Sequence, residues 1–333
     1  MKVGLVITIK NEERILRDNL LYHSAIGVSN IFIYFDGSTD NSRASIEDLE
    51  NVCCLESVSS EKYKQFDFLK KFTAQAASMH TARQCLNIYD ATQRCKALKI
   101  DWLLAMDADE LFLSDTEHPT DVTTFFEQNS SFDIIKLKPL EVISRKKSYE
   151  NVFTQETLFK SQPRFKYWND RIYFKFYDPY NDETFSHQAW LGHTMGKCAI
   201  NVNSNLRPRN VHRFVSIDER KLNTISKGRL LHYSLYDFDD FKKKFHNIKH
   251  RPDVFLNGKK LPRMALIWRN LVNDPNFDDL YLENYFVENL LVDEKKLKCF
   301  YKTRFFNLLK RSETAVVEID YVKAVFASML SSK

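Results

Sequence analysis

The chain is poor in glycine and proline. Its 333 residues include only 7 Gly and 8 Pro, against 26 Phe and 15 Tyr. So few flexible and turn-forming residues, with so many aromatics, argue against intrinsic disorder and against a long flexible linker. Apolar residues make up 44% of the chain, which is ordinary for a globular protein. The length suits one large α/β domain with an appendage, or two modest domains.

Cysteine pairs and long apolar runs are also missing. The six cysteines form no Cys-x-x-Cys pair, so the sequence predicts neither a zinc site nor a disulfide framework. No segment reaches the length of a membrane span, and the first residues lack the basic start and long apolar stretch of a signal peptide. We therefore expect a cytoplasmic protein with reduced thiols.

The formal charge of +5 is mild for this length. Nucleic-acid-binding domains usually concentrate more positive charge, so we predict no nucleic-acid partner. A modest positive surplus suits an anionic substrate such as a nucleotide diphosphate, or an anionic membrane surface.

The first half of the chain alternates apolar runs with helical patterns, the longest helical pattern covering residues 72–98. Such alternation with short connections predicts a parallel, twisted sheet with right-handed crossovers. The middle, residues 133–229, is less regular, and the last third is helical. The strand-like runs of the first half are Val3–Ile9, Asn30–Phe35, residues 52–55 and Trp102–Met106.

Polar residues follow the ends of three predicted strands: Asn11 the first, Asp36 the second and Asp107 the fourth. Asn11 also suits the N-cap of the following helix. In open α/β sheets, ligands bind outside the carboxyl ends of the strands. We therefore expect these three side chains to line one ligand site.

Asp107 and Asp109 flank Ala108 directly after the buried fourth strand. In an extended segment, residues two apart project to the same side, so the two carboxylates can converge. They would repel each other unless a cation lay between them. Oxygen ligands suit Mg²⁺ or Mn²⁺, which stabilises the charge on a diphosphate leaving group. The bland alternative is a solvated turn with acidic caps.

Asp36 opens a turn, Asp-Gly-Ser-Thr-Asp, at residues 36–40. A carboxylate at this place can accept hydrogen bonds from a nucleobase N–H or from a ribose hydroxyl. A plain turn followed by a helix N-cap is the structural alternative.

Three stretches together resemble glycosyltransferase family 2 and its relatives with the GT-A fold: VITIKNE at 6–12, IYFDGSTD at 33–40 and WLLAMDADELF at 102–112. The most similar branch carries D-x-D-E-F, with Leu111 in place of its Phe, and a later H-Y motif. The resemblance implies an α/β fold of the Rossmann-like GT-A type, a mostly parallel twisted sheet flanked by helices, with a helical C-terminal extension.

The resemblance covers residues 1–115 well and residues 190–250 weakly. It implies a glycosyltransferase domain at 1–235, made of a nucleotide-binding half (1–115) and an acceptor-side half (116–235), followed by a helical region at 236–333.

Carried over residue by residue, the resemblance implies a nucleotide-sugar pocket lined by Thr8, Asn11 and Glu12. Asp36 would hold the base, in the usual case uracil. Arg83, on the long helix, resembles a family element near the nucleotide, although an exposed helix cation is the alternative.

The same resemblance implies that Asp107 contacts ribose or metal and that Asp109 ligates the metal. Lys197, in a Gly-Lys pair, is a candidate for contact with a phosphate or the acceptor. A further metal ligand or pyrophosphate donor would be a histidine from the second half. We choose His232, because the two leucines before it suggest a strand that would bring it to the site. His212, then His187 and His193, are the alternatives.

An inverting transferase needs a carboxylate that takes the proton of the acceptor hydroxyl. Asp182 and Glu183, in a predicted loop with Asp170 behind them, are the candidates. A retaining enzyme would not require this base.

Cations and aromatics alternate at helical spacing in residues 295–311. This segment suits peripheral contact with the inner face of an anionic membrane, where lipid-linked acceptors lie. A helix packed on the domain with its basic face in water is the alternative.

We therefore predict a metal-dependent enzyme that moves a sugar from a nucleotide-sugar, most simply a UDP-sugar, to a hydroxyl of a glycan or lipid-linked glycan. One rival is a nucleotidyltransferase, which usually has a glycine-rich loop after the first strand, where residues 10–14 contain no glycine. The other is a non-catalytic protein that binds nucleotide or glycan.

Overall fold

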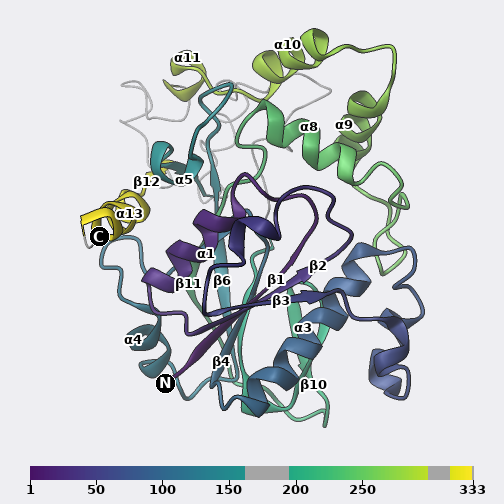
Figure 1. The fold of residues 1–333 in the computed structure, drawn as a ribbon, viewed down its shortest axis with the longest axis vertical. Helices are drawn as coiled ribbons and strands as arrows, with labels where there is room; N and C mark the ends of the chain where they lie inside the picture. Colours follow the sequence, from purple (N-terminus) through teal and green to yellow (C-terminus); the bar gives the residue numbers. More distant parts are fainter. Residues whose placement is uncertain (162–194, 299–315, 332–333) are drawn as a thin grey trace, which may run out of the picture.

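The structure is a computed structural model, and it describes residues 1–161, 195–298 and 316–331. Within these ranges a ten-stranded sheet runs through the molecule, with helices packed on both of its faces (Figure 1). This arrangement confirms the predicted α/β class. Among the described residues, no helix is long and apolar enough to cross a membrane.

The first half of the sheet is entirely parallel, in the order β3-β2-β1-β4. Its central strand β1 is buried along its whole length, which explains its unbroken apolar sequence. Because the four strands run in one direction, their carboxyl ends meet at one edge of the sheet. The strands are β1 (Val3–Ile9), β2 (Asn30–Phe35), β3 (Val52–Glu56) and β4 (Trp102–Met106).

Beyond β4 the sheet becomes mixed, in the order β4-β8-β6-β7-β12, and these neighbours pair antiparallel. Strand β11 pairs parallel with β6 and antiparallel with β5, while β9 and β10 form a separate hairpin. The strands are β5 (Glu110–Leu113), β6 (Ile134–Val142), β7 (Leu158–Lys160), β8 (Cys198–Asn201), β9 (Leu206–Asn210), β10 (Arg213–Ser216), β11 (Thr224–His232) and β12 (Val316–Glu318).

The two faces of the sheet carry separate hydrophobic clusters. On one face, alternate residues of β1 such as Leu5 and Ile7 pack with α1 (Leu16–Ala25). On the other face, Val6 packs with the buried side of α3 (His80–Ala97). The alternation of side chains along β1 therefore places one helix on each face of the parallel half.

The predicted continuous helix at residues 72–98 is wrong. The chain forms a short helix α2 (Lys70–Thr73), a turn, and then α3, with Met79 in an extended conformation before it. The break is stabilised by Arg83, whose guanidinium donates to the carbonyl oxygen of Ala76 at 2.6 Å. As a result, the first turn of α3 begins beside the carboxyl edge of the sheet.

The prediction of Asn11 as a helix N-cap is also wrong, because α1 begins only at Leu16. Asn11 instead adopts a positive φ of 58°. Its side-chain oxygen accepts the backbone N–H of Thr39 at 2.8 Å. Asn tolerates this left-handed conformation better than most residues, and the polar tip fastens the loop after β1 to the loop after β2.

The helices α8 (Phe238–Asn247), α9 (Arg263–Asn273) and α10 (Asp279–Asn289) lie together at the top of Figure 1. They share a small hydrophobic cluster that includes Phe241, Trp268 and Phe286. The chain then returns to the sheet through β12, and α13 (Tyr321–Ser331) packs near α1 and α5. The shorter helices are α4 (Val122–Glu127), α5 (Val152–Gln155) and α11 (Glu294–Lys298).

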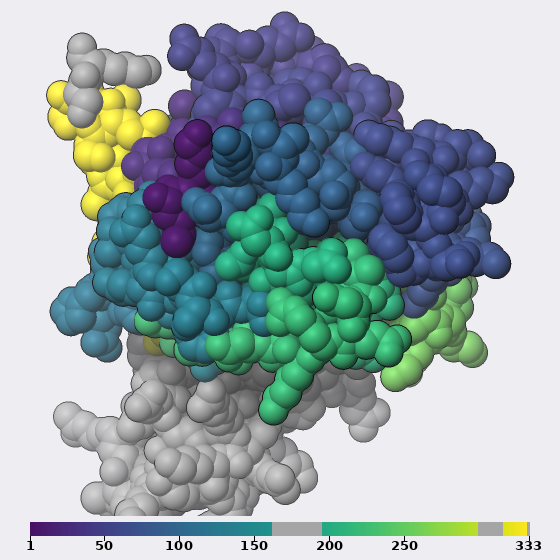
Figure 2. Space-filling model, turned by 90° about the horizontal axis from the view of Figure 1, so that it is seen from below, coloured from purple at the N-terminus to yellow at the C-terminus, as the bar shows by residue number. Residues whose placement is uncertain are grey.

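Seen from below, most of the coloured surface is formed by the first half of the chain, in purple to teal, and by the segment around β9 and β10, in green, with a light green part of the later chain at the right (Figure 2). Helix α13, in yellow, lies at one corner of this view. In Figure 1 the helices α8 to α10 lie beyond the end of the sheet that is drawn at the top, opposite the chain's N-terminus.

Candidate functional site at the carboxyl edge of the sheet

The sequence-predicted residues Asn11, Asp36 and Asp107 follow β1, β2 and β4. These strands are parallel neighbours in the order β2-β1-β4, so the three residues share one edge of the sheet. Two strand spacings, about 10 Å, separate the ends of β2 and β4.

Asp36 is buried and accepts hydrogen bonds from two residues of the first turn of α3. His80 Nδ1 lies 2.7 Å from one carboxylate oxygen, and Arg83 donates to both oxygens at 2.5 and 2.8 Å. Burial alone would raise the pKa of Asp36, but the hydrogen bonds and charges of His80 and Arg83 outweigh it and hold this pKa well below its usual range. The carboxylate is therefore charged and fixed in orientation.

Thr8 and Asn11 border the same edge. The Thr8 hydroxyl accepts a hydrogen bond from the side-chain amide of Asn87, on α3, at 3.0 Å. The Asn11 amide donates to the side-chain oxygen of Asn247 at 3.2 Å, which joins the end of β1 to the end of α8.

Asp107 has partners at both carboxylate oxygens. The amide of Gln84 donates to one oxygen at 2.5 Å, and the ammonium of Lys197 donates to the other at 2.6 Å. Burial raises the pKa of Asp107, and the Lys197 charge more than compensates, so the net pKa is lowered. Lys197, which the sequence assigned to a phosphate or the acceptor, therefore contacts the first aspartate of the pair.

The pair Asp107 and Asp109 lies in a turn rather than in an extended segment, contrary to our expectation. Glu110 closes this turn, because its carboxylate accepts the Asp107 backbone N–H at 2.7 Å. Burial raises the pKa of Glu110 to about 7. From α1, the Asn19 amide donates to the carbonyl oxygens of Ala108 and Glu110, both at 2.8 Å. The turn is thus held from inside the protein, which leaves its two aspartates at the edge.

Asp109 contacts two cationic side chains through one oxygen. Lys244 Nζ lies 3.1 Å from this oxygen, and His232 Nε2 lies 3.4 Å from it. Burial would raise the pKa of Asp109, but the charges of Lys244 and His232 lower it well below its usual value. The Asp109 backbone oxygen also accepts the Tyr233 N–H at 2.7 Å, so β11 brings His232 to the turn.

His232 is buried between two carboxylates. Its Nδ1 lies 2.9 Å from Glu141, on the neighbouring strand β6, and its Nε2 faces Asp109. Burial lowers the pKa of His232, but Glu141 and Asp109 raise it well above its ordinary value. The alternative histidine, His212, also lies near the site, since its charge contributes to the lowered pKa of Asp107.

Helix α8 packs one face across this edge, and our sequence analysis did not predict its role. Lys243 donates to Glu12 at 2.6 Å, Lys244 donates to Asp109, and the Asn247 amide donates to the carbonyl oxygen of Lys10 at 3.1 Å. Burial raises the pKa of Glu12 to about 7 although Lys243 opposes it. The spacing of these α8 residues is that of one helical face, which is the only signal that could have suggested their shared role.

The described part of the chain contains no group of three or more His, Cys, Asp or Glu side chains arranged to hold a metal ion. The carboxylates at the Asp-Ala-Asp-Glu turn are balanced instead by Lys197, Lys244 and His232. The edge can therefore hold its negative charge with the cations of the chain itself.

Several predicted residues lie outside the described ranges. They are the base candidates Asp182 and Glu183 with Asp170, the alternative histidines His187 and His193, and most of the basic and aromatic segment 295–311.

Crystal structures of other proteins show a distant likeness. HddC from Yersinia pseudotuberculosis is 9% identical, with a TM-score of 0.32, over 73% of this chain and 97% of that one. Glucosyl-3-phosphoglycerate synthase from Mycobacterium tuberculosis, in complex with Mn²⁺, UDP and glucosyl-3-phosphoglycerate, is 10% identical, with a TM-score of 0.32, over 76% of this chain and 81% of that one. At these TM-scores, neither likeness bears on a residue of the site.

Sequence comparison gives a firmer placement. A glycosyltransferase-like protein of Arabidopsis thaliana is 22% identical over 239 residues, which are 66% of this chain and 51% of that protein. The chain thus spans about half the length of this curated relative. The sequence profile of glycosyltransferase family 92 matches residues 7–257. The expected kinship with glycosyltransferases is confirmed, and because the profile covers most of the chain, the protein belongs to glycosyltransferase family 92.

Proposed function

We propose that this protein transfers a sugar from a UDP-sugar to a hydroxyl group of a glycan, with the help of a divalent cation. One observation carries the proposal: the fixed carboxylate of Asp36 and the pair Asp107 and Asp109 lie on the same carboxyl edge of parallel strands in a family 92 chain. Ligands of open α/β sheets bind at this edge.

The nucleoside would lie along the edge from β2 to β4. Asp36, held by His80 and Arg83, would accept hydrogen bonds from the base. The separation of about 10 Å between the two strand ends leaves room for a ribose between that base and a diphosphate near Asp109. Thr8, Asn11 and Glu12, at the end of the central strand β1, would border the ribose.

Two side chains of the kinds that bind metal ions meet at Asp109. An Asp109 oxygen and His232 Nε2 already face each other, and Glu141 occupies the other ring nitrogen of His232, as carboxylates do behind metal-bound histidines. Oxygen and imidazole ligands suit Mn²⁺. Asp107, whose two oxygens accept from Gln84 and Lys197, would add a second carboxylate only after turning from them. When bound, Mn²⁺ or Mg²⁺ would act as a Lewis acid that stabilises the charge of the leaving diphosphate.

The acceptor side is proposed from the sequence. A carboxylate would take the proton of the acceptor hydroxyl in an inverting reaction, and Asp182 and Glu183 are our candidates. The acceptor is a glycan or a lipid-linked glycan, and in the second case segment 295–311 would contact the membrane surface.

Calorimetry with UDP tests the donor site directly. Wild type should bind UDP more tightly with Mn²⁺ than without it, and Asp109→Ala should lose this metal dependence because a metal ligand is missing. Asp101→Ala is the matched control, since Asp101 lies at the opposite end of β4 and caps the Lys2 backbone. Equal UDP binding with and without Mn²⁺ in wild type would contradict the metal-dependent proposal.

Turnover is tested by UDP release from a panel of UDP-sugars. We expect release from at least one donor, and its loss in Asp109→Ala. UDP binding without release from any donor, with and without glycan acceptors, would instead favour a non-catalytic binding protein.

A further inference from the structure

Each aspartate of the Asp-Ala-Asp turn has its own lysine partner, and the two lysines differ in burial. Lys197 is 2% exposed and lies 2.6 Å from Asp107, while Lys244 is 33% exposed and lies 3.1 Å from Asp109. The Lys197 side chain is therefore enclosed by protein, while the Lys244 side chain reaches the solvent.

Lys197 is built into the sheet. It directly precedes β8, its ammonium also lies 3.7 Å from Glu110, and its backbone oxygen accepts the Leu137 N–H at 2.9 Å. The residue before it, Gly196, lies so close to Leu137 that an added Cβ would meet the Leu137 carbonyl oxygen at 1.9 Å. The backbone of Lys197 is therefore held against β6, and its enclosed ammonium lies between Asp107 and Glu110.

Lys244 is attached differently. It belongs to α8, which lies outside the sheet and packs with α9 and α10 in a separate hydrophobic cluster. Its ammonium is shared between Asp109 and the Ser234 hydroxyl, at 3.1 and 2.6 Å. A lysine on a flexible four-carbon stem can turn its ammonium by several ångströms without any movement of the backbone.

The position of Lys244 conflicts with a metal on Asp109. The ammonium and the His232 imidazole both address the same Asp109 oxygen, Oδ2. A divalent cation bound to this oxygen would face the ammonium at short range, and two cations so close repel each other. The ammonium must therefore leave Asp109 when a metal binds, and it requires another anion nearby.

We propose that Lys244 is an exchangeable counter-cation, which occupies Asp109 in the empty protein and moves to the donor diphosphate when metal and nucleotide bind together. The inference rests on the proposed function. It links metal binding to the nucleotide, because the diphosphate offers the ammonium an anionic partner in place of Asp109. Among the described residues near Lys244, Ser234 supplies only a hydroxyl, while Asp240 is paired with Lys243 and Glu141 with His232. Lys243, which contacts Glu12 and Asp240, keeps α8 in place during the exchange.

Mn²⁺ binding, followed by electron paramagnetic resonance of the free ion, tests this exchange without any turnover. For wild type, UDP should raise the Mn²⁺ affinity at least tenfold. Lys244→Met keeps the stem and removes the charge, so it should bind Mn²⁺ alone at least tenfold more tightly than wild type. The effect of UDP should be several-fold smaller in this variant than in wild type, because the diphosphate no longer has to supply a partner for the ammonium.

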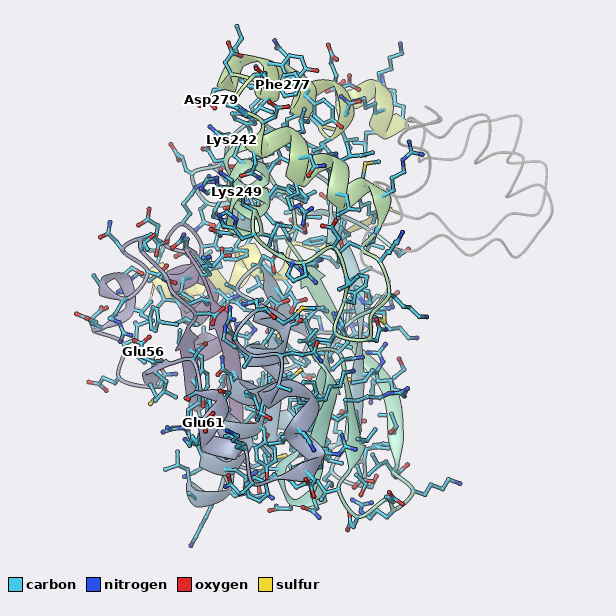
Figure 3. All side chains as sticks on the ribbon, turned by 90° about the vertical axis from the view of Figure 1, so that its right-hand side faces the viewer. Glu56, Glu61, Lys242, Lys249, Phe277 and Asp279 are labelled. Atoms are coloured by element: carbon cyan, nitrogen blue, oxygen red, sulfur yellow. The ribbon has the colours of Figure 1, made fainter. Side chains whose placement is uncertain are left out.

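Lys242→Met is the matched control. Lys242 precedes Lys243 and Lys244 on α8, but its side chain points away from the site. Its ammonium contacts Asp279 at 2.6 Å (Figure 3). It should behave as wild type in both titrations. Lys244→Gln provides a second neutral variant, and circular dichroism checks that both variants are folded.

The outcomes distinguish a failure of the proposed function from a failure of the Lys244 exchange. If wild type binds no UDP at any Mn²⁺ concentration, the proposed function is wrong. If wild type binds UDP with Mn²⁺, but folded Lys244→Met and Lys244→Gln bind Mn²⁺ alone no more tightly than wild type, only the exchange is wrong.

Discussion

Two adjacent residues at the start of α3 donate hydrogen bonds to different carboxylates of the site. Arg83 forms a fork on Asp36 after β2, and Gln84 donates to Asp107 after β4. Successive residues of a helix point about 100° apart, so one helical turn can reach two strand ends at once. The short first turn of α3 therefore sets the relative orientation of the two acidic positions.

Arg83→Met should weaken UDP binding about tenfold, or about 1.4 kcal/mol, because Asp36 loses the fork that orients it toward the base. Calorimetry with UDP measures this change. Lys96→Met, an exposed position near the other end of α3, should leave the affinity unchanged. An Arg83→Met variant with wild-type affinity would show that Asp36 needs no orientation by Arg83.

Gly196→Ala should destabilise the protein by about 2 to 3 kcal/mol, since the new methyl group overlaps the Leu137 carbonyl oxygen. Urea unfolding measures the loss. Gly258→Ala is the control: its φ of 78° strains an alanine, but no atom lies within 4 Å of the new Cβ, so about 1 kcal/mol is expected. Equal losses in the two variants would contradict the steric explanation.

At the scale of elements, α1 is fastened to the Asp-Ala-Asp-Glu turn by a polar pair in its buried face. Asn19 holds the turn carbonyls, and His23 Nδ1 lies 2.9 Å from the Asn19 side-chain oxygen. His23 Nε2 accepts the backbone N–H of Phe112 on β5 at 3.2 Å. This pattern requires a neutral imidazole with its proton on Nδ1.

The free energy of unfolding should therefore fall in mild acid, because His23 must stay neutral in the folded protein. Burial lowers its pKa to about 4 from 6.5, so between these values the unfolded chain binds the proton and the folded chain does not. The contribution is fully present above pH 6.5 and is lost as the pH falls toward 4. The pKa difference corresponds to about 2 kcal/mol between pH 7 and pH 5.

Urea unfolding of wild type and His23→Gln at several pH values measures this contribution. The difference in free energy of unfolding between the two proteins should shrink by about 2 kcal/mol from pH 7 to pH 5. His118→Gln removes an exposed histidine and should parallel wild type. Parallel curves for His23→Gln and wild type would refute the assignment.

Local patterns predicted the parallel half of the fold, because strand, helix and polar strand end each have a signal in adjacent residues. Asn11, Asp36 and Asp107 were found in this way. The break before α3 was not, since the apolar spacing continues through Phe72 and Ala76. Lys244 could not be assigned either, because its contact with Asp109 depends on how α8 packs, 135 residues along the chain.

At the scale of the whole molecule, α8 is anchored to the sheet by an ion pair whose carboxylate is fully buried. Asp237, fully buried at the N-cap of α8, accepts two hydrogen bonds from Arg14, at 3.1 and 2.7 Å, and one from the Tyr149 backbone. The loop after β1, the segment after β6 and α8 therefore meet at one carboxylate. The lysines of α8 reach the carboxyl edge because this junction fixes the start of the helix.

Arg14→Met should loosen α8, because the buried Asp237 loses its cationic partner, at a cost of about 3 kcal/mol. Hydrogen exchange should increase in α8 more than in β1 or β4. Arg17→Met, which removes an exposed pair with Asp48, should change neither. Unchanged exchange in α8 of Arg14→Met would show that its hydrophobic cluster alone holds it.

The contacts between Asn11 and Asn247 and between Glu12 and Lys243 span 236 and 231 residues. During synthesis, the parallel strands can assemble as soon as β4 has left the ribosome, but their polar edge stays open to water until α8 has followed. A nascent chain that ends before residue 238 therefore carries the acidic turn without Lys244, the lysine that contacts Asp109. Such a fragment should hold cations indiscriminately, and ligand selectivity arises only when the later part of the polypeptide arrives.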